Sequence, residues 1–223
     1  MRRILMAFIA VAAIGAFGFA GHLYWQDHQS KESLRLAAKS ISVRLDKVSN
    51  DLSNDTNITY GEFATLISES VKAIDNTVFD IKTAEAKHQS PLTADVERYA
   101  VASQRLLRTL LTFTRESVGV RTQESNAKEA LAELKTISSV DERYRWDHLM
   151  ETATKSTTKM GEHAILVSEA AEEAVSEIEA VKVASRALGQ SLGQDITASG
   201  DSLSRLAERM KGEFKPKEEK PES

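Results

Sequence analysis

The side chains best suited to metal binding or proton transfer are five histidines: His22, His28, His88, His148 and His163. Metal sites in helical bundles pair two Glu-x-x-His motifs on facing helices. Only Glu85 and His88 have this spacing, and they fall near the expected end of a helix. A single copy of the motif favours a solvated, charged helix end over a metal site. We expect His163 to be exposed rather than a ligand.

The sequence offers no recognisable arrangement of catalytic residues. It has no cysteine, which excludes a thiolate nucleophile, a thiolate metal site and a disulfide scaffold. It contains no nucleophile-elbow, phosphate-loop or zinc-protease motif. We therefore expect a protein that is not an enzyme and that holds no cofactor and no metal.

The charge pattern also restricts the class of partner. The formal net charge is −4, and no stretch of the chain is strongly basic. Phosphate binding needs clustered lysine and arginine side chains. We therefore expect no nucleic-acid partner.

The N-terminal segment, residues 1–25, has the pattern of a signal-anchor helix. Arg2 and Arg3 precede a run of eighteen uncharged residues, and Tyr24 and Trp25 follow shortly after it. About twenty apolar residues span a bilayer, aromatic residues favour its interface, and arginines favour the cytoplasmic side. We expect a single span of the bacterial inner membrane, with the rest of the chain in the periplasm.

A cleaved signal peptide is the alternative interpretation of the same segment. The small residues that signal peptidase needs are present in Gly18-Phe19-Ala20. The mature chain would then be periplasmic without an anchor. Both interpretations place the bulk of the chain outside the cytoplasm, and the lack of cysteine suits an oxidising compartment.

Proline and glycine are scarce enough to predict an all-α fold. The chain has three prolines and ten glycines, and Pro91 is the only proline in the first 215 residues. A β-rich domain of this length needs many turns, which draw on both residue types. Apolar residues instead recur at alternating spacings of three and four, as on amphipathic helices.

This spacing predicts an elongated antiparallel helical bundle over residues 28–211, whose distal part thins to a two-helix coiled coil. The charged tail, residues 212–223, is expected to be disordered. Continuity of the last helix through its glycines, from Gly189 to Gly200, is left open. The four helical segments are expected at about residues 30–53, 60–87, 92–137 and 140–211.

Local signals mark where these helices begin. Thr59 and Glu62 have the spacing of a capping box, and Pro91 suits the first turn of a helix. Gly119 weakens the third segment without a proline to end it, so we expect one long helix with a bend near this residue.

The fourth segment carries the candidate partner surface. Its apolar seam is rich in alanine, which lets a second helix pack closely, in a protein partner or in a second copy of the chain. Tyr144 and Trp146 lie two residues apart, so they cannot share one helix face. The residues we select as a candidate partner surface are Val167, Ala171, Ala174, Ile178, Leu188 and Trp146.

These features predict a non-catalytic protein that acts in protein–protein interaction, scaffolding or sensing at the membrane. The alternative is a sensor or carrier that holds a small molecule between helices. The broad apolar stripe of the third segment would then line the ligand site. Its candidate lining residues are Tyr99, Leu106, Leu110 and Phe113.

Overall fold

The structure of the chain is a computed structural model that describes residues 31–52, 59–85, 91–137, 143–192 and 198–213. Within these ranges the chain forms five helices and no strand, which confirms the all-helical prediction. The first described helix spans residues 31–52. The others are α2 (Tyr60–Glu85), α3 (Pro91–Leu134), α4 (Arg143–Leu192) and α5 (Ala198–Glu213).

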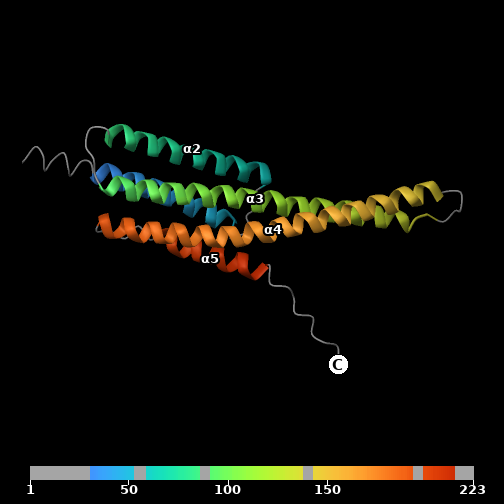
Figure 1. Cartoon of the computed structure of the whole chain (residues 1–223). Coiled ribbons are helices and arrows are strands. Elements are labelled where there is room, and N and C mark those ends of the chain that lie inside the picture. The colour runs from blue at the N-terminus through green and yellow to red at the C-terminus, as the bar shows by residue number, and fades with distance from the viewer. Residues whose placement is uncertain (1–30, 53–58, 86–90, 138–142, 193–197, 214–223) are drawn as a thin grey trace, which may run out of the picture.

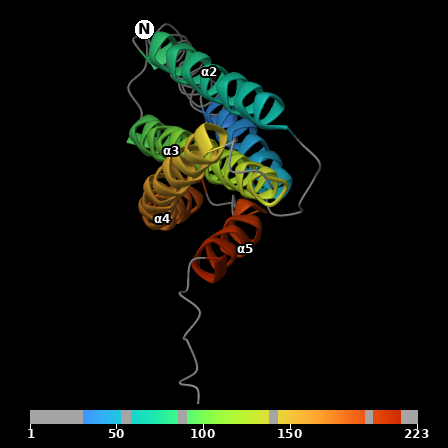
Figure 2. The same cartoon turned by 90° about the vertical axis from the view of Figure 1, so that its right-hand side faces the viewer.

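The two longest helices, α3 and α4, run antiparallel and form the axis of the molecule (Figure 1). At 1.5 Å per residue their 44 and 50 residues span about 66 and 75 Å. Helix 31–52, α2 and α5 cover only one half of this pair, and the end-on view places α2 and α5 on different sides of it (Figures 1 and 2). The molecule therefore has a many-helix body and a two-helix arm.

We define the two regions by residue. The arm is the part of α3 and α4 that extends beyond the other helices, which we take as residues 122–137 and 143–163 because Arg121 still borders residues of the other helices. The body is the remainder of the described chain, residues 31–52, 59–85, 91–121, 164–192 and 198–213.

The body has a continuous apolar core. Each helix contributes one face at the predicted three-four spacing, and most of the seam residues of the first two helices are buried. The largest fully buried side chains are Tyr99, Phe63, Ile41, Leu45, Ile67, Ile74, Leu106, Leu107, Leu110, Ile178, Leu188 and Leu203. Burial of this aliphatic surface is the main force that holds the five helices together.

Polar contacts between neighbouring helices lie around this core. The amide of Gln104 on α3 donates to Asp75 on α2 at 2.6 Å. The hydroxyl of Ser191 on α4 donates to Asp95 on α3 at 2.8 Å. Because both bonds are exposed to water, each contributes little to stability beside the apolar core.

The capping box at the start of α2 is confirmed. The Thr59 backbone N–H donates to the Glu62 carboxylate at 2.8 Å, and the Glu62 N–H donates to the Thr59 hydroxyl at 3.3 Å. The backbone bond from Thr59 holds the pKa of Glu62 below its usual value. The third helix starts at Pro91, also as predicted.

The segment expected over residues 140–211 forms two helices, because α4 ends at Leu192 and α5 begins at Ala198. The second of these helices folds back along the body (Figure 1). This buries Leu203, Leu206 and Met210 in the common core, which a straight continuation of α4 would leave in water.

Hydrogen bonds join α5 to helix 31–52. Ser49 donates to the Ser202 carbonyl at 3.0 Å, and the Ser202 hydroxyl donates to Asp46 at 2.5 Å. Arg209 donates to the carbonyl of Leu52 at 2.9 Å, which satisfies one of the free carbonyls at a helix end.

The predicted anchor, with Arg2, Arg3, Tyr24 and Trp25, lies outside the described residues, as do His88 and most of the predicted tail. No helix in the described part of the chain combines the length and the apolarity needed to cross a membrane.

Candidate functional site

Three helices of the body end at the same level along α3. The end of helix 31–52, the start of α2 and the end of α5 meet there, against the stretch of α3 from Phe113 to Arg121 (Figure 1). We call this level the step. Beyond it, α3 and α4 are the helices of the described chain that continue, and they form the arm.

A buried ion-pairing group lies at the step between α3 and α4. The carboxylate of Glu116 has a side-chain exposure of only 6%, and its Oε2 lies 2.7 Å from Nδ1 of His163 on α4. An ionised carboxylate can only accept, so Nδ1 carries the proton of this bond. The other oxygen, Oε1, accepts from Nε of Arg115 at 2.7 Å. A carboxylate with two such donors avoids the cost of an unpaired buried charge.

The hydrogen bond from His163 lowers the pKa of Glu116 most strongly. Burial opposes this by raising the pKa, and Arg115 lowers it further through its own hydrogen bond and charge. The direction that results is downward, so the group is a carboxylate at neutral pH.

Gly119 is the residue that admits the His163 ring. A Cβ atom built on Gly119 would lie 2.7–2.9 Å from three atoms of the imidazole, closer than real contacts allow. A glycine in the middle of a helix costs stability, but it permits close approach of a neighbouring side chain. Gly119 is therefore a contact site for α4, and α3 runs as one helix from Pro91 to Leu134, as the sequence predicts.

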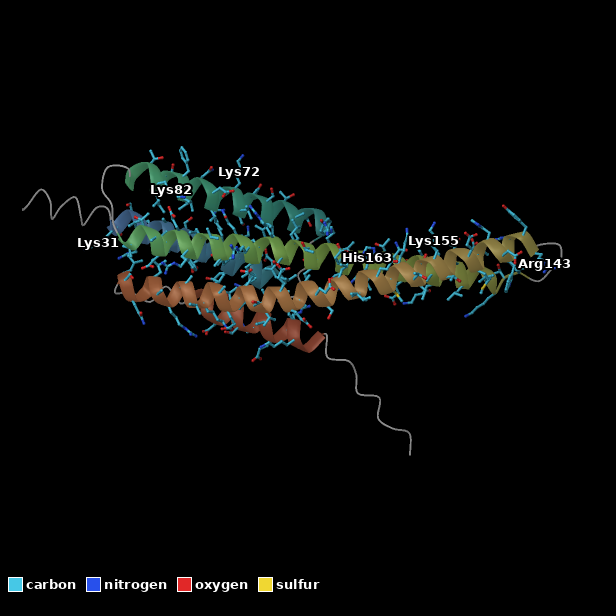
Figure 3. The ribbon with its side chains drawn as sticks, in the orientation of Figure 1. Lys31, Lys72, Lys82, Arg143, Lys155 and His163 are labelled. Atoms are coloured by element: carbon cyan, nitrogen blue, oxygen red, sulfur yellow. The ribbon has the colours of Figure 1, made fainter. Side chains whose placement is uncertain are left out.

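His163 is partly buried, with 32% of its side chain exposed, which corrects the expectation of an exposed residue. Its position at the start of the arm is visible in Figure 3. The sequence contains one signal for this contact, which is Gly119, a glycine in the middle of a helix that allows close approach of a side chain. The pairing itself requires the register of α3 against α4, which local sequence does not supply. The contact fixes that register where the arm leaves the body.

A pocket of about 190 Å³ opens at the step beside this contact. Its apolar wall includes Leu52, Phe63, Phe113 and Met210, from four different helices. The polar lining consists of Asp51, Thr59, Tyr60, Thr114, Ser117, Arg121 and Arg209. An apolar interior with a few polar groups at its edge is the usual form of a small-molecule site.

The far end of the arm exposes large aromatic side chains. Tyr144 is 87% exposed and Trp146 is 45% exposed, at the start of α4. Met150 lies one turn after Trp146 on the same face and is 37% exposed. We call these three residues the tip. Tyr144 is therefore open to solvent, whereas about half of Trp146 is covered.

The other predicted site residues lie in the body. Val167, Ala171, Ala174, Ile178 and Leu188 are buried in the chain's own core, so Trp146 is the member of that set with a widely exposed side chain. Tyr99, Leu106 and Leu110 are also sealed in the core. Phe113 alone among the predicted ligand-lining residues borders the pocket at the step.

Searches with this chain against protein families, curated proteins and solved structures found no match. The described residues contain no cluster of three or more His, Asp or Glu side chains suited to a metal ion. The tip and the step are therefore the candidate functional sites, on the basis of their geometry.

Proposed function

We propose that this chain is a non-catalytic interaction protein that binds a protein partner through the tip of its arm. The observation that carries this proposal is the exposure of Tyr144 and Trp146 at the end of a two-helix projection. Aromatic residues dominate the binding energy of many protein interfaces, because they bury a large area with few rotatable bonds.

The shape of the molecule supports this role. Lys31, at the start of the first described helix, and Arg143, at the tip, lie at opposite ends (Figure 3). If residues 1–25 anchor the chain in the inner membrane, the body and the arm together reach about 70 Å from the point of anchorage. The arm would then present its aromatic residues well away from the lipid, to a partner in the periplasm.

The anchor is a separate part of the proposal and has its own test. Alkaline carbonate extraction of membranes from cells that produce the full chain should leave the protein in the membrane pellet. Sequencing of its N-terminus should then return residues 1 onward. Release into the supernatant with a start near residue 21 would replace the anchor with a cleaved signal peptide, and digestion by external protease in spheroplasts would support the periplasmic location in both cases.

Site-specific photo-crosslinking in intact cells tests the tip. A benzophenone amino acid replaces Trp146 in one variant and Phe79 in a matched control. Phe79 is also a large aromatic residue, 69% exposed, but it lies on α2 in the body. We expect a discrete crosslinked product of higher mass from position 146 and none from position 79.

A second variant distinguishes partner binding from nonspecific contact. Tyr144→Ala, combined with the crosslinker at position 146, should reduce the yield of the product several-fold if both rings contact the partner. Equal products from positions 146 and 79, or no product from position 146, would contradict binding at the tip.

A further inference from the structure

We propose that the pocket at the step binds a small carboxylate with a single ring or a short apolar tail. This site is separate from the tip, and it does not depend on the interaction role proposed above. Nothing in the protein–protein role requires a cavity here. The proposal follows from the volume of the pocket, the charges around it and the helices that form its walls.

The volume limits the size of the ligand. The pocket measures about 190 Å³. An engineered protein cavity of about 150 Å³ holds one molecule of benzene. The pocket therefore has room for one six-membered ring and a short polar substituent, and a nucleotide or a larger cofactor would not fit.

The charges around the pocket favour an anion. Two guanidinium groups, of Arg121 and Arg209, line it together with one carboxylate, of Asp51. Arg209 already donates to the carbonyl of Leu52, whereas Arg121 is an exposed side chain on α3. An arginine at the edge of an apolar cavity offers two parallel N–H donors, which match the two oxygens of a carboxylate.

The apolar wall favours a ligand with an apolar body. Phe63, Phe113 and Met210 are all less than 8% exposed and border the same cavity. Ring edges and a thioether form favourable contacts with an aromatic or cyclic aliphatic group. A hydrated inorganic anion would gain nothing from this surface, so the structure assigns the site to an amphipathic acid.

The ligand would touch segments that are far apart in the sequence. The pocket is lined by the end of helix 31–52, the start of α2, the middle of α3 and the end of α5. A ligand that contacts all four stabilises the folded chain, because the unfolded chain has no such site.

Isothermal titration of the full chain with two probes tests the proposal. Phenylacetate carries the ring and the negative charge, and phenylacetamide has the same shape without the charge. We expect phenylacetate to bind at least about tenfold more tightly than phenylacetamide, since a charged hydrogen bond is worth more than a neutral one. It should also raise the melting temperature in a concentration-dependent way.

Three variants locate the site. Arg121→Gln should remove the preference for the acid over the amide. Ser117→Leu, which fills the pocket from α3, should abolish binding of both probes. Arg108→Gln, an exposed arginine elsewhere on the same helix, is the matched control and should leave binding unchanged.

Several results would overturn the proposed carboxylate site. The absence of binding by either probe overturns the site, and equal affinity for both probes overturns the role of charge. Binding that survives Ser117→Leu in a variant with an unchanged circular dichroism spectrum places the probe elsewhere and also overturns it. Each of these results leaves the crosslinking test of the tip unaffected.

Discussion

The body and the arm share the same two helices, yet they bury very different side chains. In the body, α3 buries large residues such as Leu106, Leu107 and Leu110. In the arm, the second apolar cluster consists of Ala130, Leu149 and Ala153, with partly buried Leu134 and Ile137 packed against it. Burial of fewer carbon atoms gives the arm less stabilisation per turn of helix.

The start of α4, which belongs to the arm, also holds a cluster of threonines. Four threonines, at positions 152, 154, 157 and 158 of α4, donate their hydroxyls to the carbonyl four residues earlier. Threonine has a lower helix propensity than alanine or leucine, and this back-bonding competes with the helical pattern. The helix pair therefore extends beyond the main core with a smaller apolar cluster to hold it together.

The largest effect should come from the core of the body. Leu110 is 1% exposed, and Leu110→Ala removes buried carbon atoms and leaves a cavity. We expect a loss of about 2–5 kcal/mol in the free energy of unfolding, measured by urea denaturation with circular dichroism. A loss below about 1 kcal/mol would mean that this core is not the main source of stability.

The step should respond differently from the arm to an added methyl group. Gly119→Ala places its Cβ against the His163 ring, and we expect a loss of about 1–3 kcal/mol. Gly161→Ala is the matched control on α4, because a Cβ there meets nothing within 4 Å. That control should gain about 0.5–1 kcal/mol from its higher helix propensity. Equal effects of the two substitutions would argue against the contact of Gly119 with His163.

The contact between Glu116 and His163 at the step should make the free energy of unfolding depend on pH. Because its partners lower the pKa of Glu116, the carboxylate stabilises the fold fully above the ordinary glutamate pKa of about 4.3. This contribution is lost as the pH falls through the lower pKa of the folded state. Glu116→Gln should therefore flatten the stability profile below about pH 4.5, as measured by urea melts at several pH values. If the free energy of unfolding of the variant falls with pH as steeply as that of the wild type, Glu116 is not the source of this pH dependence.

The smallest effect on stability is expected at the tip. Tyr144→Ala and Trp146→Ala remove exposed side chains, so each should change the free energy of unfolding by less than about 0.5 kcal/mol. Thermal melts of the two variants beside Phe79→Ala provide the measurement. A loss of more than 1 kcal/mol at the tip would assign these rings a structural role and weaken their assignment to a partner.

Much of the body could be predicted from sequence, because the patterns that identify its helices lie within each helix or at its ends. The three-four spacing of Ala38, Ile41 and Leu45 identifies the buried face of one helix. Thr59 with Glu62 identifies the start of the next. These features depend only on residues within a few turns of each other.

The candidate sites were harder to predict, because they depend on contacts between distant segments. The Glu116–His163 bond joins residues 47 positions apart, and α5 reaches the end of helix 31–52 only by folding back. An alanine seam has the same pattern whether its partner lies in the same chain or another. The chain's own helices fill that seam, around Ala171 and Ala174.

Hydrogen exchange measured residue by residue on the full chain tests the division between body and arm most directly. Amides of α3 around Leu106 and Leu110 should exchange only through global unfolding. Amides of α4 around Leu149 and Ala153 should exchange through local opening, at least about 100-fold faster. Equal protection in the two regions would contradict the account, because the arm would then be as strongly held as the core that supports it.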